Sequence, residues 1–143
     1  MPLNGPVLII DNDLEDQEFI SAILKEIDPA IDTHCFYSGQ EALDYLLITT
    51  QQPFLILCDV KMEGMNGLEL RARINGNEFL KKKSIPFVFL SDYATQENVN
   101  KAYDLTVQGF FEKANTHNGL RVQLDQIVSY WKSCLHPNRY FIT

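Results

Sequence analysis

The fold is decided by residues 55–67, which read Leu-Ile-Leu-Cys-Asp-Val-Lys-Met-Glu-Gly-Met-Asn-Gly. The apolar run at 55–58 has the length of a buried strand, and it ends in one acid, Asp59. A loop with two glycines follows, and a helical pattern begins at Leu68. An acid at the carboxyl end of such a strand lies where open α/β sheets bind ligands. An isolated Asp59 would by default only cap a turn, so this interpretation depends on the other strands.

The rest of the chain alternates short apolar runs with helical patterns. Strands are predicted at residues 7–10, 31–36, 55–58, 87–90 and 109–112. Five helices are predicted, at residues 12–27, 38–47, 68–74, 95–105 and 117–134. Asn12 with Glu15 has the spacing of a capping box at the start of the first helix. In the fourth helix, we expect Val99, Ala102 and Tyr103 to face inward.

This alternation predicts an α/β fold with a parallel sheet covered on both faces. No G-x-G-x-x-G follows the first strand, which argues against the dinucleotide-binding variant. We therefore expect a flavodoxin-like, doubly wound (βα)5 sheet of strand order 2-1-3-4-5. A single domain is expected over 1–143, with a core at about 6–135 and a short tail at 136–143 that is no output domain.

Composition excludes several classes of protein. The net charge of −7 argues against a nucleic-acid surface. We interpret Lys81, Lys82 and Lys83 as a solvated loop or helix end. The three cysteines form no C-x-x-C pair, which indicates a reducing cytoplasm and neither disulfides nor zinc. No signal peptide or membrane-spanning run is apparent.

Polar groups of complementary type follow successive strands: Asp11-Asn12-Asp13, Asp59, Ser91 and Lys113. Each alone has an ordinary interpretation, as a helix cap, a turn residue or a surface lysine. Together they lie at one sheet edge, where clustered carboxylates favour Mg²⁺. A carboxylate beside Mg²⁺, a hydroxyl and an ammonium can accept a phosphoryl group as an acyl phosphate.

With these residues the sequence resembles the receiver domain of two-component response regulators, over essentially the whole chain. Gly67 and the Gly-Phe-Phe-Glu-Lys run at 109–113 add to the resemblance. It implies that Asp59 is the phosphoryl acceptor, that Ser91 and Lys113 contact the phosphoryl group, and that Ser91 and Phe110 form a switch. It also implies that Mg²⁺ is bound by Asp11, Asn12, Asp59 and the backbone carbonyl of Lys61. The Tyr130-Trp131 pair is similar to that of single-domain regulators of cyanobacterial phytochromes.

The resemblance also implies partners. The phosphoryl donor would be a sensor histidine kinase or a phosphotransfer protein, and the output would be contact with a downstream protein. A homodimer would use the predicted fourth helix, fifth strand and last helix. Tyr140-Phe141 in the tail would either pack on that face or be disordered at the terminus. Such a domain is no enzyme beyond its own phosphorylation and slow dephosphorylation. Lys61 and Tyr93 stand where the family tunes acyl phosphate hydrolysis, and a cation with a ring there predicts slow hydrolysis.

Three positions depart from the family pattern. Asn12 replaces an acid and predicts weaker Mg²⁺ binding, Asp92 adds a carboxylate after Ser91, and Ala114 replaces a proline and its cis bond. Asn12 and Asp92 motivate an alternative, a degenerate receiver that docks proteins without phosphorylation. A further alternative is a haloacid-dehalogenase-like phosphatase using Asp11-Asn12-Asp13, which would leave Asp59 without a role.

Overall fold

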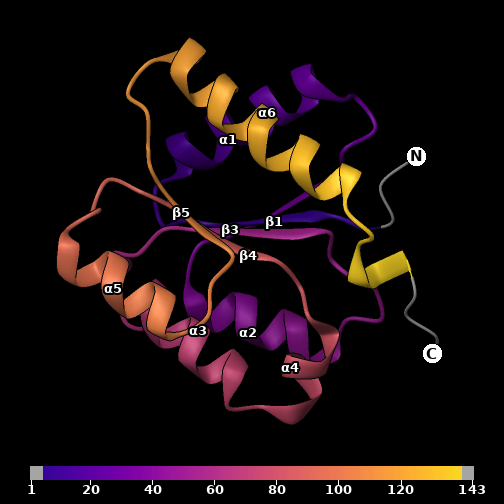
Figure 1. The fold of residues 1–143 in the computed structure, drawn as a ribbon, viewed down its shortest axis with the longest axis vertical. Coiled ribbons are helices and arrows are strands. Elements are labelled where there is room, and N and C mark those ends of the chain that lie inside the picture. The colour runs from indigo at the N-terminus through magenta and orange to yellow at the C-terminus, as the bar shows by residue number, and fades with distance from the viewer. Residues whose placement is uncertain (1–4, 140–143) are drawn as a thin grey trace.

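The computed structural model describes residues 5–139, and side chains over 5–138. Its centre is a five-stranded parallel sheet of order β2-β1-β3-β4-β5 (Figure 1). The strands are β1 (Val7–Ile10), β2 (Thr33–Phe36), β3 (Leu55–Cys58), β4 (Phe87–Ser91) and β5 (Gly109–Glu112). This order confirms the predicted flavodoxin-like topology, although β2 begins two residues later than predicted.

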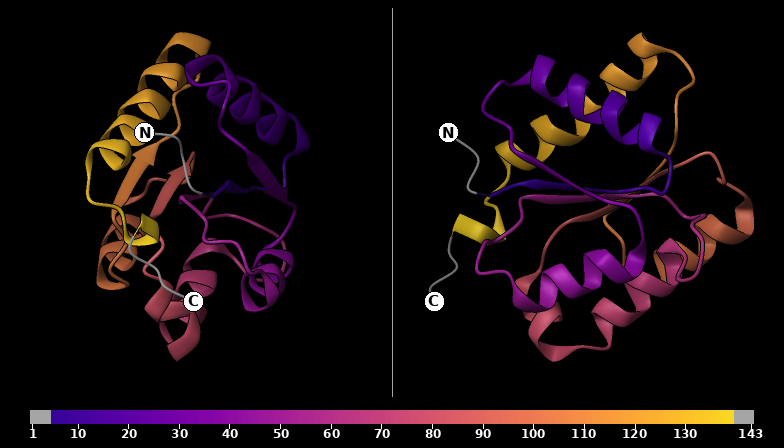
Figure 2. Two further views of the ribbon diagram at one scale, coloured as in Figure 1. Left: turned by 90° about the vertical axis from the view of Figure 1, so that its right-hand side faces the viewer. Right: turned by 180° about the vertical axis from the view of Figure 1, so that it is seen from behind.

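Helices cover both faces of the sheet. They are α1 (Leu14–Ile27), α2 (Gly39–Ile48), α3 (Gly67–Asn75), α4 (Glu78–Lys83), α5 (Gln96–Asp104), α6 (His117–Ser133) and the 3₁₀ turn η1 (Pro137–Arg139). Helices α1 and α6 lie on one face, and α2 to α5 lie on the other (Figures 1 and 2). No helix of the described residues is long and apolar enough to cross a membrane.

Alternation along the central strands builds two hydrophobic cores. In β1, Val7 and Ile9 pack under α1 and α6, whereas Leu8 and Ile10 pack against the opposite helices. All residues of β1, β3 and β4 are buried, as expected for strands covered on both faces. The two cores pack on both faces of the sheet, and the strands position the loops that follow them at its carboxyl edge.

The predicted cap of the first helix is wrong. The N-cap of α1 is Asp13, whose side chain accepts hydrogen bonds from the backbone N–H groups of Glu15 and Asp16. Asn12 therefore lies before the helix, in the loop that follows β1. The prediction depended on Glu15, which follows Asn12 by three residues, the spacing of a capping box. The true cap lies one residue later, so the residue three positions after it is Asp16 and not a Glu or Gln.

Three further expectations are corrected on the face that α2 to α5 cover. A sixth α-helix, α4, was not predicted, because six residues show too little periodicity.

Lys83 is 5% exposed and not solvated. Its Nζ donates to the Leu46 carbonyl oxygen at 3.3 Å and lies 4.7 Å from the centre of the Phe79 ring. In α5 only Ala102 is buried, and Tyr103, expected inside, is 51% exposed.

The described part of the tail packs back on the domain. His136 is 1% exposed, stacks on Phe54 with a ring distance of 4.7 Å, and places Nε2 2.6 Å from the Phe54 carbonyl oxygen. The expectation for Tyr140 and Phe141 lies outside the described residues.

Candidate functional site

Five polar side chains meet at the carboxyl edge of the sheet. Asp11 follows β1, Asp59 follows β3, Ser91 ends β4 and Lys113 follows β5. Strands β1 and β3 are neighbours from which the chain winds in opposite directions, and this is the switch point where such sheets bind ligands. The predicted convergence is therefore present, and a side chain that was not predicted, Asp16, joins it.

The Asp59 carboxylate is held by Ser91. The Ser91 hydroxyl donates to Asp59 Oδ1 at 2.5 Å, and both side chains are buried. The Ser91 Oγ accepts from the backbone N–H of Tyr93 at 3.1 Å, and the Lys61 N–H lies 3.4 Å from Asp59 Oδ1. These contacts hold the carboxylate at the floor of a cavity that opens to solvent.

Lys113 joins three acids. Its Nζ lies 2.9 Å from Asp16 Oδ2, 3.2 Å from Asp11 Oδ2 and 3.7 Å from Asp59 Oδ2. Burial alone would lower the pKa of Lys113, but the hydrogen bond that its ammonium donates to Asp16 and the charges of Asp11 and Asp59 outweigh this effect and raise the pKa. The ammonium is therefore charged at neutral pH and partly neutralises the three carboxylates.

Asp11 is 2% exposed and accepts a hydrogen bond from the Asp13 backbone N–H at 2.9 Å. Burial raises its pKa, and the charge of Asp59 adds to this effect, against the lowering effects of the Asp13 N–H and Lys113. A buried carboxylate with a raised pKa gains from a further cation nearby.

Gly67 allows the loop after Asp59 to close. A Cβ at this position would collide with the Asp59 carbonyl oxygen and lie 2.7 Å from the Phe89 ring. The Gly67 N–H donates to the Val60 carbonyl oxygen at 2.8 Å. The start of α3 is thereby drawn against the end of β3, beneath the Asp59 carboxylate.

Side chains from three loops, those after β1, β3 and β4, form the wall of the cavity. Asn12, Lys61, Asp92 and Tyr93 line it together with Asp59. The Lys61 ammonium lies 4.7 Å from the centre of the Tyr93 ring, a cation–π contact that links the loops after β3 and β4. The Asp92 side chain is exposed at this wall.

Phe110 lies next to the site on β5. It is half-buried, pairs with Phe89 in the β4–β5 ladder and packs on that ring at 5.4 Å. Beyond the strand, Gln123 donates to the Glu112 carbonyl oxygen and accepts from the Ala114 N–H, which fixes the loop after Lys113. No cis peptide bond occurs among the described residues.

The sequence interpretation missed two residues that hold the site together. Asp16 binds Lys113. Gln17 is buried and its Nε2 donates to the carbonyl oxygens of Asp11 and Phe36 at 2.6 and 2.9 Å, which ties α1 to the ends of β1 and β2. Because Asp13 is the N-cap of α1, Asp16 lies in the first turn of that helix, near the sheet edge. Identifying Asp13 as the cap from the sequence would therefore have indicated that Asp16 lies near the site.

Comparison with known proteins identifies the family of the chain. The response regulator receiver domain model matches residues 7–125, so the chain belongs to this family. It is 28% identical to the probable transcriptional regulator ycf29 of Pyropia yezoensis over 86% of this chain. It is 25% identical to response regulator Rcp1 of Synechocystis over 87% of each chain. The fold matches the phosphorylated cyanobacterial phytochrome response regulator RcpA with a TM-score of 0.85 and 24% identity, over 94% of this chain and 99% of that one.

The lengths of these relatives differ. The chain spans 53% of ycf29 and 16% of the response regulator-like PRR37 of Oryza sativa. The similarity to the cyanobacterial phytochrome regulators confirms the expected resemblance to that type. The phosphatase alternative finds no support in these relatives.

Proposed function

We propose that this receiver accepts a phosphoryl group on Asp59 from a phosphohistidine of a sensor histidine kinase or phosphotransfer protein. The observation that carries the proposal is the position of Ser91 Oγ, 2.5 Å from Asp59 Oδ1, and of Lys113 Nζ, 3.7 Å from Asp59 Oδ2. A hydroxyl and an ammonium at the two carboxylate oxygens are the groups that stabilise a transferred phosphoryl group.

In the transfer, an Asp59 carboxylate oxygen attacks phosphorus, and the phosphorus–nitrogen bond of phosphohistidine breaks. The leaving imidazole keeps the electron pair of that bond and takes a proton from solvent. The product is an acyl phosphate on Asp59. Lys113, already beside Oδ2, then contacts a phosphoryl oxygen, and Ser91 follows another.

The residues at this edge fit a hard divalent cation. Six acidic side chains line the cavity: Asp11, Asp13, Asp16, Asp59, Glu63 and Asp92. No group of three His, Cys, Asp or Glu side chains in the described chain is arranged around one metal position. Following the family resemblance, we propose that Asp11 and Asp59 hold Mg²⁺ together with the Asn12 amide oxygen and the Lys61 backbone carbonyl, all oxygen ligands of the kind that this cation prefers. When bound, the cation neutralises phosphoryl oxygens, and a solved structure of the similar Rcp1 holds Mn²⁺.

The output is a change of surface. Phosphorylation draws Ser91 toward the phosphoryl group and lets the half-buried Phe110 repack, which alters the face formed by α5, β5 and α6. That face would bind a downstream protein or a second copy of the chain. We place this exchange in the cytoplasm, within one receiver domain with a core at about 6–135.

Intact mass spectrometry tests the proposal. The full chain is incubated with Mg²⁺ and acetyl phosphate, with Asp59→Asn as the comparison. We expect the mass of one phosphoryl group to be added to the native chain and none to the variant. Equal addition to both proteins would overturn the assignment of Asp59.

A second function, docking without phosphorylation, is favoured by one observation. The exposed Asp92 carboxylate lines the acceptor cavity and would repel a phosphoryl group. No mass addition to a folded native chain would support docking, and phosphorylation restored by Asp92→Ala would identify the cause.

A further inference from the structure

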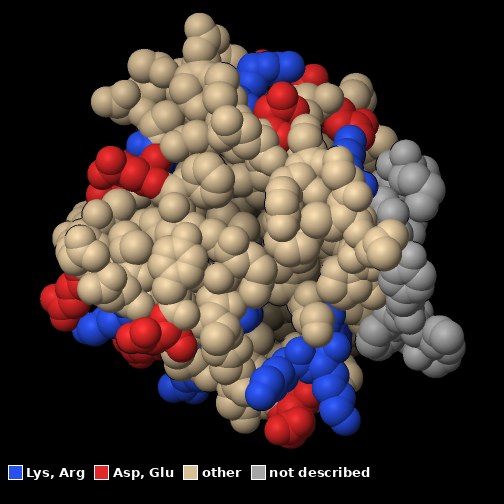
Figure 3. Space-filling view, in the orientation of Figure 1, with Lys and Arg blue, Asp and Glu red and all other residues tan. Residues whose placement is uncertain are grey.

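A second cavity lies at the amino edge of the sheet, away from Asp59. It is enclosed by α3, α4 and the residues that lead into β4 and β5, and its volume is about 230 Å³. Its apolar wall includes Ile56, Ile74 and Leu80. Figure 3 shows a hollow in this face of the molecule, beside the lysine side chains over α4.

The cavity contains a buried cation. Arg71 is 8% exposed, and its Nε and Nη2 donate to the Leu105 and Thr106 carbonyl oxygens at 3.1 and 3.0 Å. Its guanidinium forms no ion pair with an acid in the described chain, and none of the lining residues is acidic. Burial accordingly lowers the pKa of Arg71. A buried charge without a counter-charge is costly, so an anion here would be stabilised.

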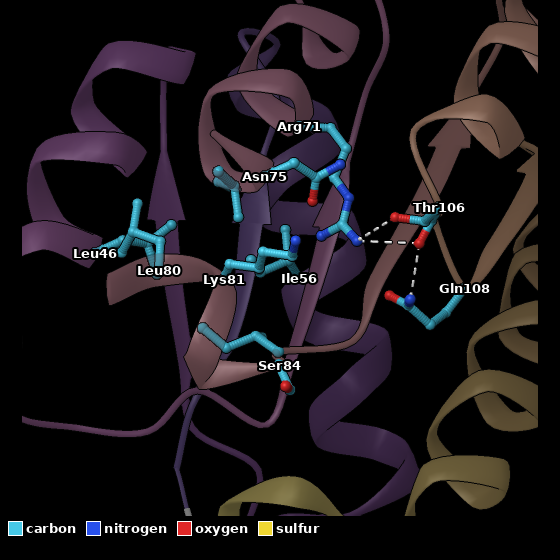
Figure 4. Close-up of a pocket in the computed structure, with 11 residues that line it drawn as sticks. Leu46, Ile56, Arg71, Asn75, Leu80, Lys81, Ser84, Thr106 and Gln108 are labelled. Carbon is cyan, nitrogen blue, oxygen red and sulfur yellow. Dashed lines mark hydrogen bonds between the residues drawn. The ribbon is translucent and has the colours of Figure 1, made fainter. Parts of the chain in front are cut away.

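Lys81 supplies a second cation. Arg71 reaches into the cavity from α3, and Lys81 reaches into it from α4 (Figure 4). The Lys81 side chain is exposed, so it lies at the mouth, whereas the guanidinium lies deeper. Two cations over an apolar wall match a ligand with one charged end and one apolar end.

Backbone strain is concentrated around the same cavity. Ser84 and Thr106, with φ of 52° and 62°, are the only non-glycine residues of the described chain with positive φ. Both line the cavity. This conformation is unfavourable for a β-branched residue such as Thr106, and strain of this kind clusters at ligand sites.

We propose that this cavity binds a small carboxylate with an apolar body. The carboxylate pairs with Arg71 and Lys81, and the apolar body packs on Ile56, Ile74 and Leu80. A cavity of roughly 150 Å³ holds benzene, so the larger volume here accommodates a benzoate-sized molecule. Inorganic phosphate has no apolar part to bury against this wall, so it gains less from the cavity than such a carboxylate does.

NMR titration of the full-length, ¹⁵N-labelled chain tests the proposal. Sodium benzoate, benzyl alcohol and inorganic phosphate are added separately at constant ionic strength. We expect saturable amide shifts with benzoate at Arg71, Lys81 and Thr106, and far weaker shifts with the other two probes. Absence of saturable shifts with benzoate would overturn the proposal. Equal binding of benzyl alcohol would remove the role of the cations, and equal binding of phosphate would remove that of the apolar wall.

Two matched pairs of variants locate the charge. Lys81→Gln is compared with Lys82→Gln, an exposed neighbour that does not line the cavity. Arg71→Gln is compared with Arg73→Gln, which is exposed on the same helix. Losing one charge-assisted contact should weaken benzoate binding by about tenfold, with no change in either control. If Lys81→Gln and Lys82→Gln weaken benzoate binding equally, the attraction is nonspecific and the proposed site is overturned. This comparison remains decisive even if Arg71→Gln fails to fold.

Discussion

Asp16 competes for the lysine that a phosphoryl group on Asp59 would need. Lys113 Nζ lies 2.9 Å from Asp16 and 3.7 Å from Asp59, so the ammonium is held nearer to the helix than to the acceptor. A phosphoryl group brings oxygens closer to Lys113 than the Asp59 carboxylate does. We therefore expect the strength of the Asp16 contact to set part of the free energy that the proposed phosphorylation of Asp59 must supply.

Tyr93→Ala should shorten the lifetime of the acyl phosphate. Under the proposed function, we expect the Lys61–Tyr93 contact to screen Asp59 from water, and its loss removes about 0.5–1 kcal/mol of cation–π attraction. We expect hydrolysis to become about threefold faster, measured as loss of label from purified phosphoprotein. Tyr103→Ala, on the exposed face of α5, is the control and should leave the lifetime unchanged. Equal lifetimes in all three proteins would contradict the screening role.

Asp11→Asn should stabilise the metal-free protein at neutral pH. The pKa of Asp11 is raised above the ordinary 3.8, chiefly by burial, so the folded chain holds this proton more tightly than the unfolded chain. The stability contributed by Asp11 is thus present at acid pH and is lost as pH rises from 3.8 through the folded pKa.

Urea unfolding across this pH range, in chelator, measures the effect. Asp11→Asn should raise the free energy of unfolding by its full amount at pH values above the pKa that Asp11 has in the folded chain. This gain in the free energy of unfolding should vanish at pH values below the pKa that Asp11 has in the unfolded chain. Asp44→Asn, on the exposed side of α2, is the control. A gain that persists unchanged in acid would contradict the role of ionisation.

At the scale of elements, the start of α3 lies against the end of β3 with no space between them for a side chain. The Gly67 position leaves no room for a Cβ between the Asp59 carbonyl and the Phe89 ring. Gly76, at the other end of α3, has φ of −80° and its nearest neighbour at 3.4 Å from an added Cβ. A side chain at position 67 would therefore collide with its neighbours, whereas one at position 76 would not.

Gly67→Ala should lower the free energy of unfolding by about 2 kcal/mol, because overpacking forces the loop away from the end of β3. Gly76→Ala is the matched control and should be neutral or raise stability by about 0.5 kcal/mol. Denaturant unfolding of both variants measures the difference. Similar stability of the two variants would show that the loop relaxes without cost.

At the scale of the whole molecule, negative charge is gathered at one edge of an acidic protein. The net charge is −7, and six of the acids line the cavity around Asp59. The basic cavity at the amino edge has no acidic lining residue. The two ends of the sheet thus favour ligands of opposite charge.

Mg²⁺ should raise the free energy of unfolding by about 1.4 kcal/mol for each tenfold increase above its dissociation constant. Asn12→Asp adds a carboxylate to the cavity. In this variant the free energy of unfolding should begin to rise at an about tenfold lower Mg²⁺ concentration. Asn100→Asp adds the same charge on the exposed side of α5 and should leave that concentration unchanged. An equal shift in both variants would trace the effect to net charge alone.

The sequence by itself determined the sheet, its order and the convergence of Asp11, Asp59, Ser91 and Lys113. Burial imposes a period on every strand and helix, and parallel strands bring their carboxyl ends to one edge, so the strands and the convergence follow from local patterns. The order 2-1-3-4-5 followed from the absence of a G-x-G-x-x-G motif after the first strand. Only the tertiary structure decided the partners of the charged side chains. Asp16 meets Lys113 across 97 positions and Arg71 meets Thr106 across 35. Lys83 is buried although its neighbours are exposed. Such contacts depend on helix phase and on packing between distant segments, which no local pattern contains.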